Sequence, residues 1–182
     1  MRYFAKSLNR NMECAMTVMS TMPDFDVADF RRTLGCFPTG VTIVTALTST
    51  GAPVGVTISS FNSVSMEPPL VLWSLSRSAA SLPVFHASDG FAINVLSATQ
   101  ADLPKVFSSP VAERFDAVDW STGSCGYPVL TEATAVIECR TYARYDGGDH
   151  EIFLGQVLSH HSTDRTPLVF GKGKLGAFAV GG

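Results

Sequence analysis

The sequence predicts a mainly β protein, an antiparallel barrel with peripheral helices. Short runs in which apolar and polar residues alternate recur along the chain, and turn residues separate most of them. The chain has neither a βαβ alternation nor a GxGxxG sequence, which argues against a Rossmann nucleotide site. We therefore expect about six or seven strands, joined mostly by hairpins, and about two or three helices.

In the first part of the chain, one helix precedes three strands. Asp24 or Asp26 can cap the helix, and Gly35 stands where it should end. Its apolar face follows helical spacing: Val27, Phe30 and Leu34. Strands are expected over residues 41–46, 54–58 and 70–75, the first two as a hairpin. The Pro68-Pro69 pair blocks ladder pairing, so the third strand should begin after it.

Further along, helical and extended segments alternate before the chain becomes entirely β. Ser78 can cap a helix that ends near His86 and contains Pro83. Two more helical segments are expected at 99–107 and 111–115. The Gly147-Gly148 pair should turn the chain between its two longest strands. The expected strands are 91–96, 133–145, 151–160, 168–170 and 175–180.

The composition fits one domain with an unusually apolar surface. At 182 residues and 19.4 kDa the chain is long enough to bury a core. Hydrophobic residues make up 46% and charged residues 16%, so we expect a homodimer partner or a ligand to cover part of the surface. The net charge of −3, without a basic cluster, argues against nucleic-acid binding.

Cysteine spacing, histidine motifs and hydropathy exclude several other classes of site. No CxxC pair and no zinc-ligand spacing is present, so we expect no metal site and reduced thiols in a cytoplasmic protein. The cysteines are Cys14, Cys36, Cys125 and Cys139. No GxSxG or HExxH sequence supports a catalytic triad or a zinc site. No run reaches the roughly 20 apolar residues of a membrane-spanning helix.

Residues 1–23 are expected to form a flexible N-terminal segment ahead of a domain over residues 24–182. Asn9, Asn11 and Glu13 interrupt its weakly apolar stretch, which argues against a signal peptide. Five of the six methionines lie in it and leave the start of translation open: Met1, Met12, Met16, Met19 and Met22.

The block from residue 37 to residue 72 carries a dense set of small hydroxyl residues on strand-like runs. They are Thr39, Thr42, Thr57, Ser59, Ser60, Ser63 and Ser65. Uncharged hydroxyl and peptide N–H groups beside apolar strand residues suit a flat, partly apolar ligand with many hydrogen-bonding atoms, such as a flavin ring. The alternative is an ordinary half-buried sheet, because threonine is common in strands.

Two further polar clusters are candidates for ligand contacts. The segment Ser76-Arg77-Ser78-Ala79-Ala80-Ser81 combines hydroxyls, one guanidinium and the start of a helix, which suits a phosphate. The segment Asp146-Gly147-Gly148-Asp149-His150 places an Asp-His pair directly after a tight turn. A simple helix cap and a simple hairpin turn are the structural alternatives for these two segments.

Six motifs in a fixed order resemble those of one family, the flavin reductase-like domain. They read PTGVTIVT, GVTISSFNSVSMEPPLVL, GFAINVL, RFDAVDW, GYPVL and YDGGDHEIFLGQV. The resemblance runs from about residue 25 to residue 178. It implies an FMN-binding split β-barrel, usually a homodimer, that binds FMN or FAD near the subunit interface.

The resemblance also implies roles for individual residues. Residues beside the isoalloxazine ring would be Pro38, Thr39, Gly40, Val41, Thr42, Thr57, Ile58, Ser59, Ser60, Phe61 and Phe107. Ser63 and Val64 would lie near the ribityl chain, and Ser76, Ser78 and Ser81 would hold phosphate. Gly148, Asp149 and His150 would lie beside the nicotinamide, with His150 the catalytic candidate. Ser59 departs from the family pattern, because many relatives carry asparagine there.

The implied activity is that of an NAD(P)H:flavin oxidoreductase. NADH, rather than NADPH, would pass a hydride directly to FAD or FMN, and the protein would supply position and electrostatics. The reduced flavin would then diffuse to a separate monooxygenase that hydroxylates an aromatic, phenolic compound. Two alternatives remain: a flavin-binding electron carrier that does not oxidise NADH, and a non-catalytic barrel that binds another cofactor such as haem.

Overall fold

The computed structural model describes residues 25–108 and 114–179, which divide into two compact units after Phe37. The first unit contains helix α2 (Val27–Leu34). The Asp26 carboxylate caps it by accepting hydrogen bonds from Ala28 N and Asp29 N at 2.8 and 3.0 Å, and Gly35 ends it. This helix and its cap are therefore as predicted. The flexible segment expected over residues 1–23 lies outside the described residues.

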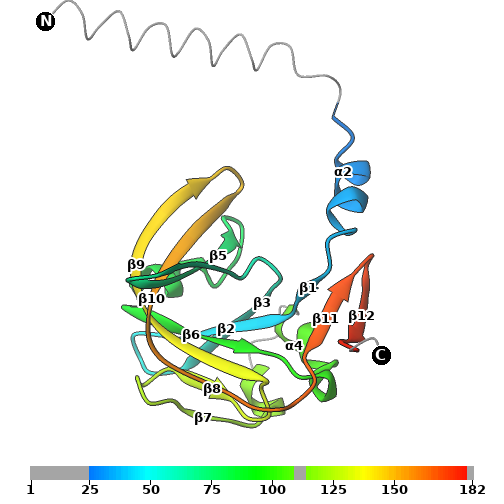
Figure 1. Cartoon of the computed structure of the whole chain (residues 1–182). Helices are drawn as coiled ribbons and strands as arrows, with labels where there is room; N and C mark the ends of the chain where they lie inside the picture. The colour runs from blue at the N-terminus through cyan, green and yellow to red at the C-terminus, as the bar shows by residue number, and fades with distance from the viewer. Residues whose placement is uncertain (1–24, 109–113, 180–182) are drawn as a thin grey trace, which may run out of the picture. The chain divides into compact units, whose positions relative to one another are not determined.

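The second unit, from Pro38 onward, is built almost entirely of antiparallel strands (Figure 1). A seven-stranded sheet has the order β3-β2-β6-β9-β10-β5-β4, beside small sheets β1-β11-β12 and β7-β8. The first six strands are β1 (Thr39–Gly40), β2 (Thr42–Leu47), β3 (Pro53–Ile58), β4 (Asn62–Met66), β5 (Pro69–Ser76) and β6 (Gly90–Val95). The others are β7 (Trp120–Thr122), β8 (Pro128–Leu130), β9 (Ala135–Gly147), β10 (His150–Ser162), β11 (Leu168–Gly171) and β12 (Lys174–Ala177). The predicted fold class, mainly antiparallel β with peripheral helices, is confirmed.

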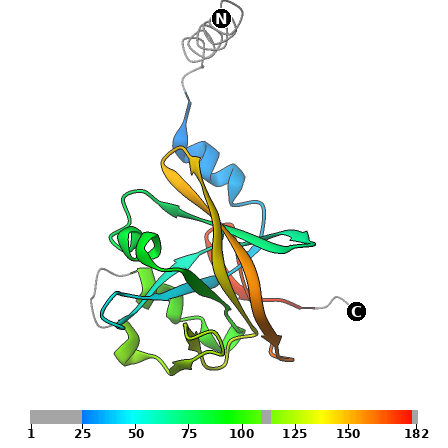
Figure 2. The ribbon, with the colours of Figure 1, turned by 90° about the vertical axis from the view of Figure 1, so that its left-hand side faces the viewer.

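The hairpin of β9 and β10 is the longest feature of the sheet, with 13 residues in each strand (Figure 2). β9 pairs with β6 on one side of the hairpin, and β10 pairs with β5 on the other. A tight turn joins the two strands as predicted, but it lies at Gly148 and Asp149, one residue later than expected, because Gly147 still pairs with His150. Gly148 has φ +78°, a conformation that glycine adopts without strain. His150, the first residue of β10, pairs with both Gly147 and Ser76.

The seven-stranded sheet must curl, because its two edge strands are joined by only three residues, 59–61. Ile58 and Asn62 are four residues apart, so the chain can span at most about 14 Å between them. The edges of a flat seven-stranded sheet would be about 29 Å apart. The Ser60 hydroxyl supports the junction: it accepts a hydrogen bond from Ser74 N at 2.9 Å and donates to Ser74 O at 3.2 Å.

Four short helices lie between the strands of the described residues, and they correct two details of the prediction. They are α3 (Leu82–Ala87), η1 (Ala98–Gln100), α4 (Leu103–Ser108) and η2 (Arg114–Ala117). Ser81, not Ser78, is the N-cap residue of α3, which places Pro83 in the first turn, where its missing N–H costs nothing. The continuous helix expected over 99–107 is interrupted, because Pro104 favours the start of a new helix over the interior of one. Most of the segment expected at 111–115 lies outside the described residues.

Four of the described strands, β1, β4, β7 and β8, were not predicted, and the start of β5 contradicts one expectation. Strand β4 and the pair β7-β8 have no clear alternation in the sequence, and all three residues of β7 are exposed. Strand β5 begins at Pro69, which pairs with Met66 beside the turn. A proline is tolerated as the first residue of a strand, so the expectation that it would block pairing was wrong.

The core of the sheet surrounds Trp73, which is fully buried. Its ring stacks on Phe153 with centroids 4.6 Å apart, and it meets Phe85 and Phe91 edge to face. Cys139 belongs to the same cluster, and burial raises the pKa of its thiol to about 12. The described cysteines are free thiols, whereas Cys14 lies outside the described residues.

We expect Trp73→Ala to lower the free energy of unfolding by about 3–5 kcal/mol, because it removes a large buried side chain and three ring contacts. Urea unfolding followed by circular dichroism measures this change. Met66→Ala is the control: Met66 is 87% exposed, so its effect should stay within about 0.5 kcal/mol. Equal effects of the two substitutions would contradict the placement of Trp73 at the centre of the core.

Candidate functional site

Three cavities border strand β3, and Thr57 lines all of them. The first has a volume of about 350 Å³, the second about 330 Å³ and the third about 510 Å³. These volumes fall within the range of about 300–1,000 Å³ typical of small-molecule sites. The first and second cavities also share Ile58 and Ser59, so a ligand in one is separated from a ligand in the other by a single strand end.

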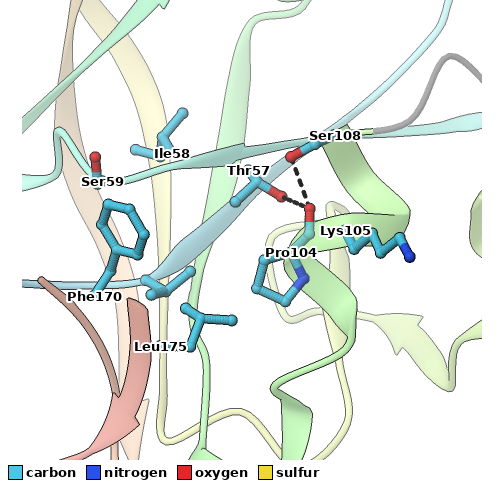
Figure 3. Close-up of a pocket in the computed structure, with 9 residues that line it drawn as sticks. Thr57, Ile58, Ser59, Pro104, Lys105, Ser108, Phe170 and Leu175 are labelled. Carbon is cyan, nitrogen blue, oxygen red and sulfur yellow. Dashed lines mark hydrogen bonds between the residues drawn. The ribbon is translucent and has the colours of Figure 1, made fainter. Parts of the chain in front are cut away.

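The first cavity has one apolar wall and one hydroxyl-bearing wall (Figure 3). Phe170 and Leu175, which are paired across β11 and β12, form the apolar wall opposite Ile58 and Ser59. Helix α4 closes the remaining side and contributes an exposed cation, Lys105. The full lining is Val41, Thr57, Ile58, Ser59, Pro104, Lys105, Ser108, Phe170 and Leu175.

Hydrogen bonds within the protein determine whether the hydroxyls of the first cavity can donate a hydrogen bond to a ligand or only accept one. Thr57 Oγ1 and Ser108 Oγ both donate to Pro104 O, at 3.1 and 2.7 Å (Figure 3). Because each hydroxyl has a single proton, both can only accept from a ligand. The Ser59 hydroxyl has no hydrogen-bond partner within residues 25–108 and 114–179, so it can donate or accept. This cavity therefore offers acceptors, one free hydroxyl and a flat apolar surface.

The second cavity is lined by hydroxyl residues of the 37–72 block and by His150, which follows the turn of the β9-β10 hairpin. Its wall runs from β3 across to β5 and ends at His150. Ser59 and Ser60, predicted from the 37–72 block, and Ser76, predicted from the 76–81 segment, line it together. The full lining is Val56, Thr57, Ile58, Ser59, Ser60, Ser74, Leu75, Ser76, Ala79 and His150.

The His150 ring is oriented by its neighbour Asp149. His150 Nδ1 lies 2.8 Å from Asp149 Oδ1. A carboxylate only accepts hydrogen bonds, so the proton of this bond belongs to Nδ1. In the neutral imidazole Nε2 is then an acceptor. The contact with Asp149 thus fixes which nitrogen carries the ring proton in a residue that lines the second cavity.

Two more of the predicted site residues, Ser81 and Phe107, line the third cavity. Phe107 is only 1% exposed and packs edge to face on Phe115, so its contribution is a small patch of ring. Arg114 also lines this cavity, and its guanidinium donates to Gly55 O and Phe107 O at 3.0 and 3.2 Å.

Ten predicted residues do not line the three cavities: Pro38, Thr39, Gly40, Thr42, Phe61, Ser63, Val64, Ser78, Gly148 and Asp149. Thr42 is 2% exposed, and its hydroxyl donates to Ile58 O at 3.3 Å. Ser63 and Val64 are exposed on edge strand β4. Ser78 lies beside the second cavity, where its hydroxyl contacts that of Ser76 at 2.8 Å. Thr39 is opposite Phe170, and its buried Oγ1 has no partner in the described part of the chain.

The sequence argument missed most of the first cavity. Phe170 and Leu175 lie more than 100 residues from Thr57 and come from short strands that carry no chemical motif. Pro104, Lys105 and Ser108 lie on a helix whose existence, but not whose role, could be predicted. The only available signal was the short period-2 pattern of residues 168–177.

Two classes of site find no support in residues 25–108 and 114–179. No group of three or more His, Cys, Asp or Glu side chains is arranged to hold a metal ion. None of the helices among these residues is long and apolar enough to cross a membrane.

Residues 34–179 match the family described as the flavin reductase like domain. The chain belongs to this family. It is 46% identical over 150 residues to the FMN reductase (NADH) SmoA of Agrobacterium fabrum, which covers 82% of this chain and 85% of that protein. It is 37% identical over 150 residues to the flavin-dependent monooxygenase reductase subunit HsaB of Rhodococcus jostii, covering 82% of this chain and 76% of HsaB.

A solved structure of the family has the same fold. The Streptomyces globisporus NADH:FAD oxidoreductase SgcE6, crystallised with NAD and FAD fragments, superimposes with a TM-score of 0.81 at 40% identity. The match covers 85% of this chain and 93% of SgcE6. The chain spans only 48% and 65% of the lengths of two further relatives, so those two proteins are longer.

We expect Ser60→Ala to lower the free energy of unfolding by about 1–3 kcal/mol, because Ser74 N and Ser74 O both lose the Ser60 hydroxyl as a partner. The same change should weaken ligand binding in the second cavity, which Ser60 lines. Chemical unfolding and a titration with NADH measure the two effects. Ser121→Ala, on exposed strand β7, is the control. An unfolding free energy equal to that of the wild type would refute the role given to the Ser60 junction.

Proposed function

We propose that this chain is an NADH-dependent flavin reductase that transfers a hydride from NADH to FMN or FAD. One observation carries the proposal: two cavities of ligand size meet across the shared wall of Thr57, Ile58 and Ser59. Direct transfer between two bound rings needs such adjacent sites and does not need a protein nucleophile. The names of SmoA and SgcE6, both NADH-dependent flavin enzymes of this family, support the same assignment.

The residues of the first cavity fit an isoalloxazine ring. Such a ring is flat, largely apolar on its faces and rich in polar atoms at its edge. Phe170 and Leu175 offer a flat apolar wall, and Ser59 offers a hydroxyl without an internal partner. The buried Thr39 Oγ1 lacks a partner in the described part of the chain and lies in the strand pair that holds Phe170. When bound, the flavin supplies the ring that accepts the hydride.

Residues at the rim of the site would hold the charged parts of the ligands. Lys105 places a positive charge beside the first cavity, where it would balance an anionic ligand. Ser76, Ser78 and Ser81 would contact phosphate, since Ser76 lines the second cavity and Ser81 the third. These cavities adjoin along β3, so a dinucleotide has room to extend beyond the ring.

The second cavity would receive the nicotinamide. His150 would contact it there, since its ring orientation is set by Asp149. The backbone of Gly148 shapes the turn that presents both residues. We assign these residues to binding and orientation of NADH, because hydride transfer itself moves no proton through the protein.

The reduced flavin would leave for a separate monooxygenase that hydroxylates an aromatic compound. The name of HsaB, a reductase subunit of a flavin-dependent monooxygenase, supports the first half of this proposal. The chain would act in the cytoplasm, where NADH is available, and as a homodimer. The mean hydropathy of +0.21 and the exposed Met66 and Val64 on edge strand β4 support an apolar contact between copies.

The deciding experiment mixes the purified chain with NADH and added FMN or FAD and follows the nicotinamide absorbance. Loss of that absorbance at a rate proportional to protein concentration is the expected result. A protein that binds flavin but leaves NADH unoxidised would be the electron carrier considered above. A Soret band after incubation with haem, without NADH oxidation, would favour the haem-binding alternative.

We expect His150→Ala to raise the KM for NADH by about three- to tenfold, the effect of one lost hydrogen bond or ring contact. The Kd for FMN should change less than twofold by the same estimate, since His150 lines the second cavity and not the first. Steady-state kinetics and flavin fluorescence measure the two constants. His160→Ala, at the exposed far end of β10, is the matched control. A larger change in Kd for FMN than in KM for NADH would reverse the assignment of the two cavities.

We expect Phe170→Ala to weaken the binding of riboflavin, FMN and FAD by the same factor, roughly two- to tenfold, because Phe170 faces the ring that all three share. Fluorescence titration with each flavin tests this. Phe178→Ala, which removes an exposed phenylalanine outside the cavity, is the control. An effect confined to FAD would mean that Phe170 contacts the adenylate instead.

A further inference from the structure

Arg77 joins the end of β5 to the turn of the β9-β10 hairpin through three hydrogen bonds. Its backbone N–H donates to Asp149 O at 3.0 Å. Its guanidinium donates through Nε to Gly148 O at 3.0 Å and through Nη2 to Asp146 Oδ1 at 2.7 Å. The hydrogen bond from Arg77 lowers the pKa of Asp146, with help from the N–H of Gly148, so the carboxylate is charged at neutral pH.

The turn contains no buried residue. Residues 144–149 are all exposed, so no core packing reaches this end of the hairpin. Gly148 has φ +78° and adds no side chain. A turn with few buried contacts opens locally unless hydrogen bonds restrain it. The three bonds from Arg77 supply that restraint from a neighbouring strand.

Arg77 is itself fixed by a carboxylate beneath it. Its Nη1 lies 3.7 Å from Oε2 of Glu151, whose side chain is only 11% exposed. His86 Nε2 lies 3.0 Å from both carboxylate oxygens of Glu151, and Arg144 Nε lies 3.9 Å from one of them. A carboxylate that is buried with several donors keeps one geometry, because loss of any donor leaves charge poorly compensated. Arg77 therefore bridges a rigid group and an exposed turn.

We propose that Arg77 is a positioning residue for NADH, which acts by holding the 146–149 turn so that Asp149 keeps His150 directed at the second cavity. The inference rests on the proposed function, since it concerns the nicotinamide half of that site. Arg77 does not itself line any of the three cavities. Its effect passes through Asp149, whose carbonyl accepts from Arg77 and whose carboxylate bonds to the His150 ring.

The test compares Arg77→Gln with Arg140→Gln. Both replace a largely exposed arginine, but Arg140 donates to Gln156 between β9 and β10, away from the turn. Arg77→Gln should raise the KM for NADH roughly fivefold or more, with kcat and the Kd for FMN within about twofold of wild type. Arg140→Gln should leave all three constants unchanged. Arg77→Lys should recover little of the KM, because an ammonium cannot reproduce the fork that reaches Gly148 and Asp146 together.

Two further variants keep the proposal open to refutation if Arg77→Gln folds poorly. Asp146→Asn removes the charged partner, and Gly148→Ala strains the turn while leaving Arg77 in place. Both should raise the KM for NADH without weakening FMN binding. An unchanged KM for NADH in folded Arg77→Gln, or in both of these variants, overturns the proposal. An equal loss of FMN affinity would make Arg77 a flavin contact and overturn it too.

The outcomes separate this proposal from the proposed function. If the wild type does not oxidise NADH with either flavin, the proposed function fails. If the wild type is active and Arg77→Gln has the same KM for NADH, only the positioning role fails.

Discussion

The three residues that join β3 to β4 impose the shape on which the site depends. They connect the two outer strands of a seven-stranded sheet, so the sheet has to curl until those strands lie within reach of each other. Strand β5, which pairs with β4, is brought to the end of β3 by the same closure. At that point the Ser60 hydroxyl makes the hydrogen bonds to Ser74 N and Ser74 O that a neighbouring strand would otherwise make. The second cavity is the space enclosed between these strand ends and His150.

Two hydroxyls in the walls of the site have no proton left to donate to a ligand. Thr57 Oγ1 donates to Pro104 O, and Ser60 Oγ donates to Ser74 O. Ser59 lies on the three-residue connection and is spared this use. The chemistry left to the site is therefore mainly acceptance of hydrogen bonds, apolar contact and orientation. Such a set suits hydride transfer between two bound rings better than acid–base or nucleophilic catalysis.

Local features of this fold could be predicted from the sequence, and those that depend on distant pairing could not. The cap of α2, the β2-β3 hairpin and the turn at Gly148 follow from residues within one or two turns of each other. Strand β4 has an irregular pattern because its pairing with β5 contains a register shift between Ser63 and Ser65. Phe170 reaches the site only through its pairing with Thr39, which no local pattern encodes. The resemblance of the motifs to those of the family was enough to assign Ser59 and His150 to one site, without knowledge of how these strands pair.

The charged groups around Glu151 lie apart from the wall that the first and second cavities share. Glu151 gathers Arg77, His86 and Arg144 behind the strand that begins with His150, and none of these four groups faces the first cavity. Charge is thus concentrated where a flexible turn needs restraint, whereas the shared wall of the two cavities carries no charge. Hydride transfer requires the two rings to keep a close and constant separation, and it loses rate steeply when they drift apart. In the proposed arrangement, the end of β3 beside the flavin would be held by the hydrophobic core through Ile58. The turn beside the nicotinamide would be held by hydrogen bonds instead.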